Sequence, residues 1–127
     1  MFDPALKKNY DRDGFLIAEA LFDKSEINEI RRRIDTLIAD PDHPPEGVTI
    51  GREGKTAGDR QASQARDDSV RSAAFLVRFL PFFQDFARQE KLLELVRGLI
   101  GPRIKVFRDQ ALFKPPGGQA KPPHQDQ

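Results

Sequence analysis

The sequence contains no cysteine, and it has only two histidines among its 127 residues. Without cysteine the chain can form neither a disulfide bond nor a zinc-thiolate site, and it has no thiol nucleophile. It also lacks any apolar run near the roughly 18 residues that a membrane-spanning helix needs. Its first residues show no apolar stretch of the kind found in secretory signals, so we expect a cytoplasmic protein.

An excess of charge of either sign is also missing. Twenty-one basic residues balance twenty acidic ones, which leaves a formal charge of +1. We therefore expect neither nucleic acid nor a membrane surface as a partner, and the balance says nothing about oligomeric state. The three consecutive arginines at residues 31–33 are balanced by nearby acids of the same segment, at Glu26, Glu29 and Asp35. We therefore interpret them as a solvated helix face.

Three helices are predicted from apolar residues that recur at helical spacing between recognisable caps. A length of 127 residues suits one domain with its own core. The helices are expected from Asp3-Pro4 to Gly14, from Asp23 to Pro41, and from about Glu90 to Gly101-Pro102.

The segments between these helices differ in composition. Residues 15–22 contain short apolar runs that suggest a buried strand or extended piece, whereas residues 41–68 are polar and suggest a long loop or mobile segment. Both a lid and a passive loop fit the latter composition. Five phenylalanines between residues 75 and 86 are expected in the core, with Pro81 dividing the stretch in two.

After the third helix, the period of the sequence changes from helical to two. Residues 104–113 alternate as in a strand, which puts Gln110 and Leu112 on one face and Ala111 and Phe113 on the other. A turn, PPGG at residues 115–118, follows. Helices followed by a few strands predict an α+β protein, yet the strands are too few to close a barrel or a sandwich.

The last residues contain His124 and Asp126, which are two positions apart. In an extended backbone their side chains point to the same side, so an imidazole and a carboxylate can converge on one metal ion. Two histidines and one carboxylate on one face of ferrous iron leave sites open for a co-substrate and oxygen. Alternatively, the pair is an exposed His and Asp that bond to each other. The only other histidine, His43, lies in the polar segment, and nothing in the sequence brings it to this pair.

At these residues the chain resembles the phytanoyl-CoA dioxygenase family. The resemblance is carried by ALFKPPGG at residues 111–118 and PHQD at residues 123–126, and upstream by YDRDGFLI at residues 10–17. The expected helices at residues 26–39 and 92–101 correspond to two helices of that family. The resemblance thus covers most of the chain outside residues 41–68, and PHQD is its most specific part.

The resemblance implies an α+β fold in which N-terminal helices pack on a double-stranded β-helix, a cupin-like jelly roll. Residues 1–127 would be the N-terminal part of one oxygenase domain and would hold only its first strands. The activity implied is that of an Fe(II)- and 2-oxoglutarate-dependent dioxygenase that hydroxylates a small organic molecule with O₂ and releases succinate and CO₂. His124 and Asp126 would be metal ligands, and Gln110 and Arg78 would contact 2-oxoglutarate.

Two of the family's site residues are not found in this sequence, which leaves several alternatives for what the chain does. The third ligand, a histidine, and the arginine that binds the far carboxylate of 2-oxoglutarate normally lie well downstream. The chain would then be part of a longer enzyme, inactive by itself, or a catalytically incomplete form that binds without turnover. A cupin-like metal protein of other chemistry, such as an isomerase, is a third possibility. Asp126 favours hydroxylation or desaturation, because related halogenating enzymes have a small residue there. For Arg78 the structural alternative is a surface arginine covering the phenylalanine cluster.

Overall fold

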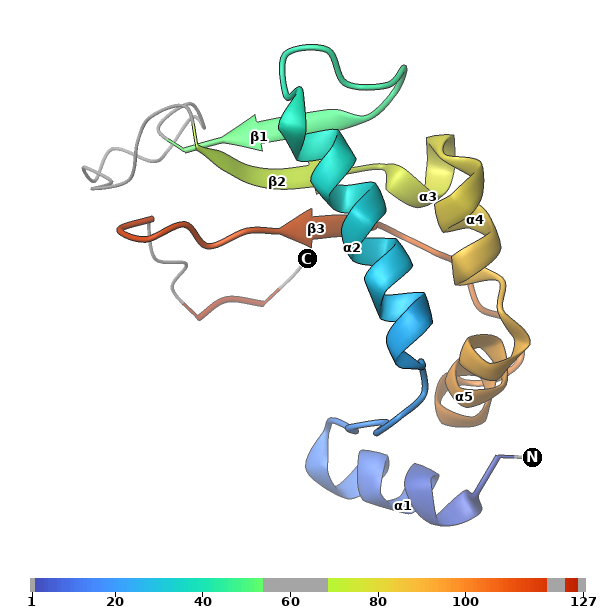
Figure 1. The fold of residues 1–127 in the computed structure, drawn as a ribbon. Helices are drawn as coiled ribbons and strands as arrows, with labels where there is room; N and C mark the ends of the chain where they lie inside the picture. Colours follow the sequence, from blue (N-terminus) through green and yellow to red (C-terminus); the bar gives the residue numbers. More distant parts are fainter. Residues whose placement is uncertain (1, 54–68, 119–122, 126–127) are drawn as a thin grey trace.

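A computed structural model describes residues 2–53, 69–118 and 123–125 of the chain. It shows an α+β arrangement in which helices lie across one face and at one end of a small antiparallel sheet (Figure 1). Along the chain the elements are α1 (Pro4–Asp13), α2 (Lys24–Ala39), β1 (Thr49–Arg52), β2 (Val70–Ala74), α3 (Leu76–Phe79), α4 (Pro81–Ala87), α5 (Glu90–Ile100) and β3 (Gln110–Leu112).

The three expected helices are confirmed as α1, α2 and α5, and side-chain caps mark the starts of α1 and α2. In α2 the Asp23 carboxylate accepts a hydrogen bond from the Glu26 backbone N–H at 2.9 Å. The Glu26 side chain in turn accepts from the Asp23 N–H at 2.9 Å, which completes a capping box. Gly14 ends α1 with a φ of 78°, a left-handed conformation that glycine adopts without strain.

The arginine run lies on the exposed side of α2, as the charge pattern predicts. Glu29 accepts hydrogen bonds from Arg32 at 2.8 Å and from Arg33 at 2.7 Å. These two guanidinium groups, Arg32 first, lower the pKa of the Glu29 carboxyl to about 2. Arg32 and Arg33 therefore pair with an acid of their own helix.

The strands form one antiparallel sheet in the order β1-β2-β3. Ile50 lies opposite Ala73, and Ala73 lies opposite Ala111, so the three residues share one face of the sheet. Helix α2 covers this face (Figure 1). The core lies between them, and its buried members are Val48, Ala73, Leu76 and Phe83.

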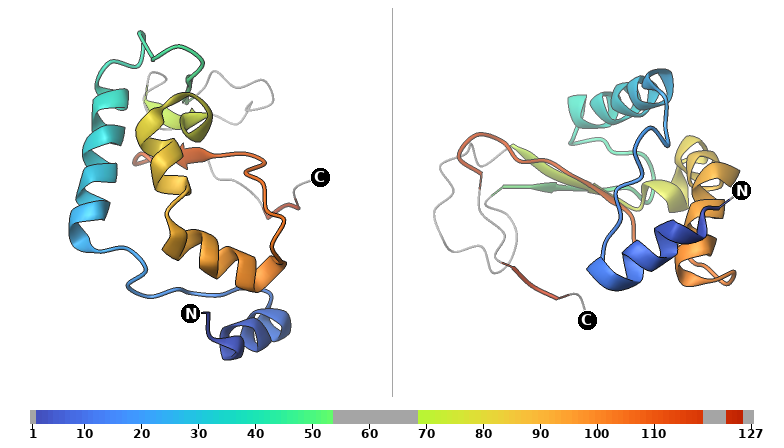
Figure 2. Two further views of the ribbon diagram at one scale, coloured as in Figure 1. Left: turned by 90° about the vertical axis from the view of Figure 1, so that its right-hand side faces the viewer. Right: turned by 90° about the horizontal axis from the view of Figure 1, so that it is seen from below.

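The opposite face of the sheet is not covered by α2. Leu112 points to this side and is 66% exposed, whereas its neighbours Ala111 and Phe113 pack against the core. The alternation predicted for residues 110–113 is therefore confirmed. Both views in Figure 2 place α2 on one side of the sheet and residues 123–125 on the other.

The sheet differs from the sequence prediction in its extent. Of the strand expected over residues 104–113, the structure forms only Gln110–Leu112, because β2 offers three residues as partners there. Val106 and Phe107 alternate in sequence but lie exposed, at 60% and 94%. Alternation alone therefore overestimated the strand, since a strand also needs a neighbour for its backbone groups.

Two other segments also differ from expectation. Residues 41–68 were expected to be a loop, yet Val48 is buried and Thr49–Arg52 forms β1; residues 54–68 lie outside the described ranges. Of the buried strand or extended piece expected within residues 15–22, no strand forms, and Phe15 and Ile17 are 64% and 73% exposed. As predicted, Pro81 separates two helices, α3 and α4. Across the described residues, no helix is long and apolar enough to cross a membrane.

Candidate functional site

His124 lies in the short described stretch at residues 123–125 and is exposed. This stretch passes on the side of the sheet away from α2 (Figure 2). Asp126, its predicted partner, lies outside the described residues, so the spacing of the two side chains rests on the sequence alone. Their role as metal ligands therefore stays a prediction.

Gln110, the first predicted 2-oxoglutarate contact, begins β3 and lies opposite Ala74 of β2. Because Ala111 faces the core, the Gln110 side chain points to the face that α2 leaves open, where it is exposed. Residues 123–125 lie on the same side of the sheet (Figure 2). The fold thus places Gln110 and the His124 segment on one side.

Arg78, the second predicted contact, lies on α3 and is exposed. Its guanidinium carbon sits 5.2 Å from the centre of the Phe79 ring, a cation–π distance. This contact agrees with the structural alternative for Arg78, a surface arginine over a phenylalanine. A contact with 2-oxoglutarate is untested and stays a prediction.

Asp109 connects the elements that carry Arg78 and Gln110. Its carboxylate accepts a hydrogen bond from the Val77 backbone N–H at 2.9 Å, and its carbonyl accepts from the Phe75 N–H at 3.3 Å. Phe75 precedes α3 with a φ of 65° and caps it with no side-chain bond of its own. Asp109, which directly precedes β3, therefore caps the first turn of α3 and holds this helix beside the strand.

Replacing Asp109 with alanine is expected to destabilise the chain by about 1.5–3 kcal/mol, the range for hydrogen bonds to charged groups. The change also leaves the first turn of α3 without its side-chain acceptor. Asp109→Asn keeps an acceptor oxygen and should recover about half of that loss. Urea denaturation of the three chains measures the effect. A loss below about 0.5 kcal/mol for the alanine variant would be typical of an ordinary surface site and would contradict this role.

The role of Asp109 was not predicted from the sequence, although the sequence places a carboxylate on a largely apolar strand face. Asp109 shares its strand face with Ala111 and Phe113, which pack against the core. A carboxylate on an apolar face needs a specific partner, because burying it without one is costly. The sequence pattern can indicate that Asp109 has a specific partner. It cannot identify that partner, Val77, which lies 32 positions away.

His43, the other histidine of the chain, is hydrogen bonded to Asp40 near the end of α2. Its Nδ1 lies 2.9 Å from the Asp40 carboxylate, and this hydrogen bond is the main reason that the pKa of His43 is raised. It lies in the loop before β1, at the opposite edge of the sheet from β3. The structure therefore gives no support to His43 as a ligand beside His124.

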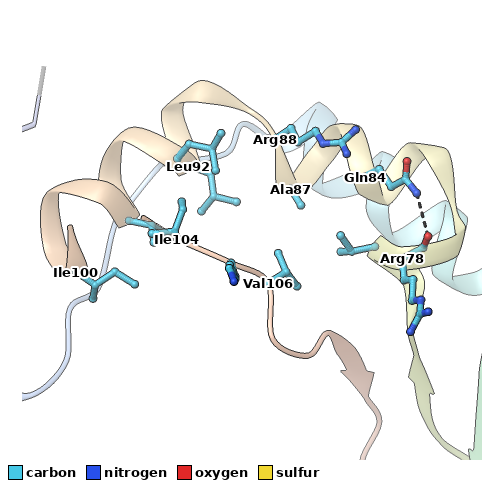
Figure 3. A pocket seen from close by; sticks show the side chains of 12 residues that line it. Arg78, Gln84, Ala87, Arg88, Leu92, Ile100, Ile104 and Val106 are labelled. Atoms are coloured by element: carbon cyan, nitrogen blue, oxygen red, sulfur yellow. Dashed lines mark hydrogen bonds between the residues drawn. The ribbon is translucent and has the colours of Figure 1, made fainter. Parts of the chain in front are cut away.

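One cavity among the described residues is lined by Arg78 but not by Gln110 or His124. It has a volume of about 520 Å³ and runs between α4, α5 and residues 104–106. Figure 3 shows its apolar walls, with Arg78 and Gln84 at one end and Ile100 at the other. Neither Gln110 nor His124 lines it, so we do not assign it to the metal site.

The donor types at the end of the chain suit ferrous iron, but they are too few to hold it. An imidazole and a carboxylate are the ligands of a two-histidine, one-carboxylate site. Among the described residues no group of three His, Asp or Glu side chains could hold a metal ion. The residue types at positions 124 and 126 thus fit part of such a site, and within the described residues no third ligand is brought to them.

Comparison with known families adds an independent observation. The family model described as phytanoyl-CoA dioxygenase (PhyH) matches residues 10–127, nearly the whole chain. The chain belongs to the phytanoyl-CoA dioxygenase family. The resemblance found in the sequence motifs is thereby confirmed. No solved structure matches the chain significantly.

The curated relatives of this phytanoyl-CoA dioxygenase family chain include several ectoine dioxygenases. Those of Bordetella parapertussis and Streptomyces coelicolor are 27% and 24% identical to it over 109 and 105 residues. The matches cover 85% and 83% of this chain and 31% of each relative. That of Sphingopyxis alaskensis is 21% identical, with 84% and 31% covered. The chain thus spans about a third of the length of the curated relatives it matches.

Proposed function

We propose that this chain is the N-terminal part of an Fe(II)- and 2-oxoglutarate-dependent dioxygenase that hydroxylates a small organic molecule. The supporting observation is that residues 123–125, which include His124, run on the side of the sheet to which Gln110 points, in a chain of the phytanoyl-CoA dioxygenase family. Because the chain spans a third of its relatives, the activity belongs to the full-length protein.

Each residue of the proposed site has a distinct task. His124 and Asp126 would hold Fe(II), with a histidine from beyond this chain as the third ligand. Gln110 would orient 2-oxoglutarate by hydrogen bonding, and Arg78 would offer its carboxylate a positive charge. When bound, the metal and co-substrate supply the oxidising power for C–H hydroxylation, with succinate and CO₂ as co-products. The protein's share is to orient the reactants and to keep water out.

The proposed architecture extends the sheet that is present. The three strands would continue into a jelly roll, of which residues 1–127 form the first part. The exposed apolar side chains of Val106 and Leu112 support this, since 60% and 66% of their surface lies uncovered in this chain. We propose that later strands of the full-length protein cover them.

The names of the relatives suggest the kind of substrate. Three of them are ectoine dioxygenases, so a small, polar organic molecule is the first class to test. Identities of 21–27% leave room for a different substrate within that class. Ectoine is therefore one member of a test panel.

Succinate release by the full-length protein tests the proposal. With Fe(II), 2-oxoglutarate and O₂ present, we expect 2-oxoglutarate to be converted to succinate, faster when an accepted substrate is added. An identical reaction without Fe(II) or with a chelator is the control. No succinate above this control, together with no binding of Fe(II) or Mn(II), would favour the alternative of a binding domain without turnover. This chain alone should bind Mn(II) weakly, because it lacks the third ligand.

A further inference from the structure

Glu53 is a buried acid that has no place in the site described above. Only 1% of the residue is exposed, and it is the single charged residue buried within the described ranges. It directly follows β1, where its backbone N–H donates to the Ser69 carbonyl at 2.9 Å. A carboxylate is costly to bury unless it has a specific partner, so its position calls for a reason.

One partner of Glu53 is Arg71 of β2. Arg71 Nη1 lies 3.9 Å from Glu53 Oε2, and the arginine side chain is 12% exposed. The Arg71 backbone carbonyl accepts a hydrogen bond from the Phe113 N–H at 2.8 Å. Arg71 thus links the end of β1 to the chain that leaves β3.

The turn at residues 115–118 lies directly against the Glu53 carboxylate. The Gly118 N–H donates to the Pro115 carbonyl at 2.9 Å, and Gly117 has a φ of 75°, so the turn is hydrogen bonded. A Cβ atom at Gly118 would lie 3.1 Å from Glu53 Oε1 and 3.0 Å from the Pro115 oxygen. A Cβ there would be a tighter contact than usual, so the turn or the Glu53 side chain would have to shift by a few tenths of an ångström.

We propose that Glu53 and Arg71 are positioning residues that fix the turn at residues 115–118 and thereby place the segment carrying His124. The backbone carbonyl of Arg71 accepts the Phe113 N–H before the turn, and the Glu53 carboxylate lies against Gly118 at the end of the turn. His124 follows Gly118 by six residues, a span of at most about 20 Å. Anchoring Gly118 therefore limits where His124 can lie.

A role in stability alone is a poor explanation for this pair. Replacing a buried ion pair by apolar residues of similar volume is often neutral or stabilising, so such pairs add little to stability. Their better-supported use is to specify one geometry among several. A defined geometry is what a metal ligand needs, because misplaced ligands bind the ion weakly. This inference rests on the function proposed above.

The test compares Mn(II) affinity in the full-length protein with hydrogen exchange at the Gly118 amide. In Glu53→Gln we expect Mn(II) binding to weaken about tenfold, as when groups that orient metal ligands are removed. The Gly118 amide should exchange faster. Val48→Ala is the matched control: Val48 is buried in the core just before β1, so its loss lowers stability without touching the turn. It should leave both readouts unchanged.

Two further variants separate positioning from folding. Glu53→Gln combined with Arg71→Gln leaves no unpaired charge and should recover stability relative to Glu53→Gln, yet Mn(II) binding should stay weak because neither charged side chain remains to hold the turn. Gly118→Ala keeps the ion pair but pushes the turn away, and it should also weaken Mn(II) binding, even where Glu53→Gln fails to fold.

The outcomes distinguish this inference from the proposed function. Unaltered protein that binds no Mn(II) would overturn both. Normal binding by the unaltered protein, with Glu53→Gln and Gly118→Ala no weaker than Val48→Ala, would overturn the positioning role alone.

Discussion

Replacing His124 with alanine in the full-length protein is expected to weaken Mn(II) binding by at least about a hundredfold, more than the loss of a ligand-orienting group costs. The change would leave two of three protein ligands and remove the nitrogen donor next to Asp126. Succinate release should fall to the level without metal. Calorimetric titration with Mn(II) and a succinate assay measure the two effects.

His43→Ala is the matched control, because it removes the only other histidine of the chain. His43 is exposed and bonded to Asp40 near the end of α2, at the far edge of the sheet from β3. Its loss should change neither Mn(II) affinity nor succinate release. Equal losses for the two histidine variants would contradict the assignment of His124, as would a His124→Ala protein with normal affinity.

The helices were predictable from the sequence because their signals are local. The Asp23 and Glu26 pair of α2 lies within one turn, and Pro81 interrupts the chain where α3 gives way to α4. Such caps and breaks act through neighbouring residues, so the order of residues contains the information directly. The solvated arginine face of α2 was predictable for the same reason.

The sheet was less predictable, because its strands depend on partners far along the chain. Ile50 of β1 lies in a polar segment that resembled a loop, and its strand forms only by pairing with β2, where Ile50 lies opposite Ala73. Residues 70–74, VRSAA, have no strong alternation, yet Ala73 is fully buried beneath α2. Tertiary pairing here overrides local preference.

The candidate site likewise has a part that was predictable from local sequence patterns and a part that was not. The spacing of His124 and Asp126 is a local pattern, and the direction of Gln110 followed from the period of its strand. The supporting contacts were not visible in the sequence: Asp109 reaches Val77 across 32 positions, and Glu53 contacts Arg71 and Gly118. These supporting contacts join residues that are far apart in the sequence and meet only when the chain folds, so sequence spacing does not reveal them.

Phe83→Ala is expected to destabilise this chain by about 3–5 kcal/mol, the cost of removing a phenylalanine from a core. Phe83 on α4 is 8% exposed and packs edge to face on Phe82, with ring centres 5.2 Å apart. Small domains are stabilised by only about 5–15 kcal/mol in total. The loss should therefore bring the chain close to unfolding at room temperature, as measured by urea denaturation.

Phe107→Ala makes the same chemical change at a residue that is 94% exposed. No buried area is lost there, so its effect should stay within about 0.5 kcal/mol. The pair of variants makes the same chemical change at a buried and at an exposed phenylalanine, so the difference between them measures packing. A loss below about 1 kcal/mol for Phe83→Ala would mean that the core beneath α2 is not packed as described. If Phe107→Ala were as harmful as Phe83→Ala, residues 104–107 would have to be covered in this chain, which its exposed Val106 and Phe107 side chains contradict.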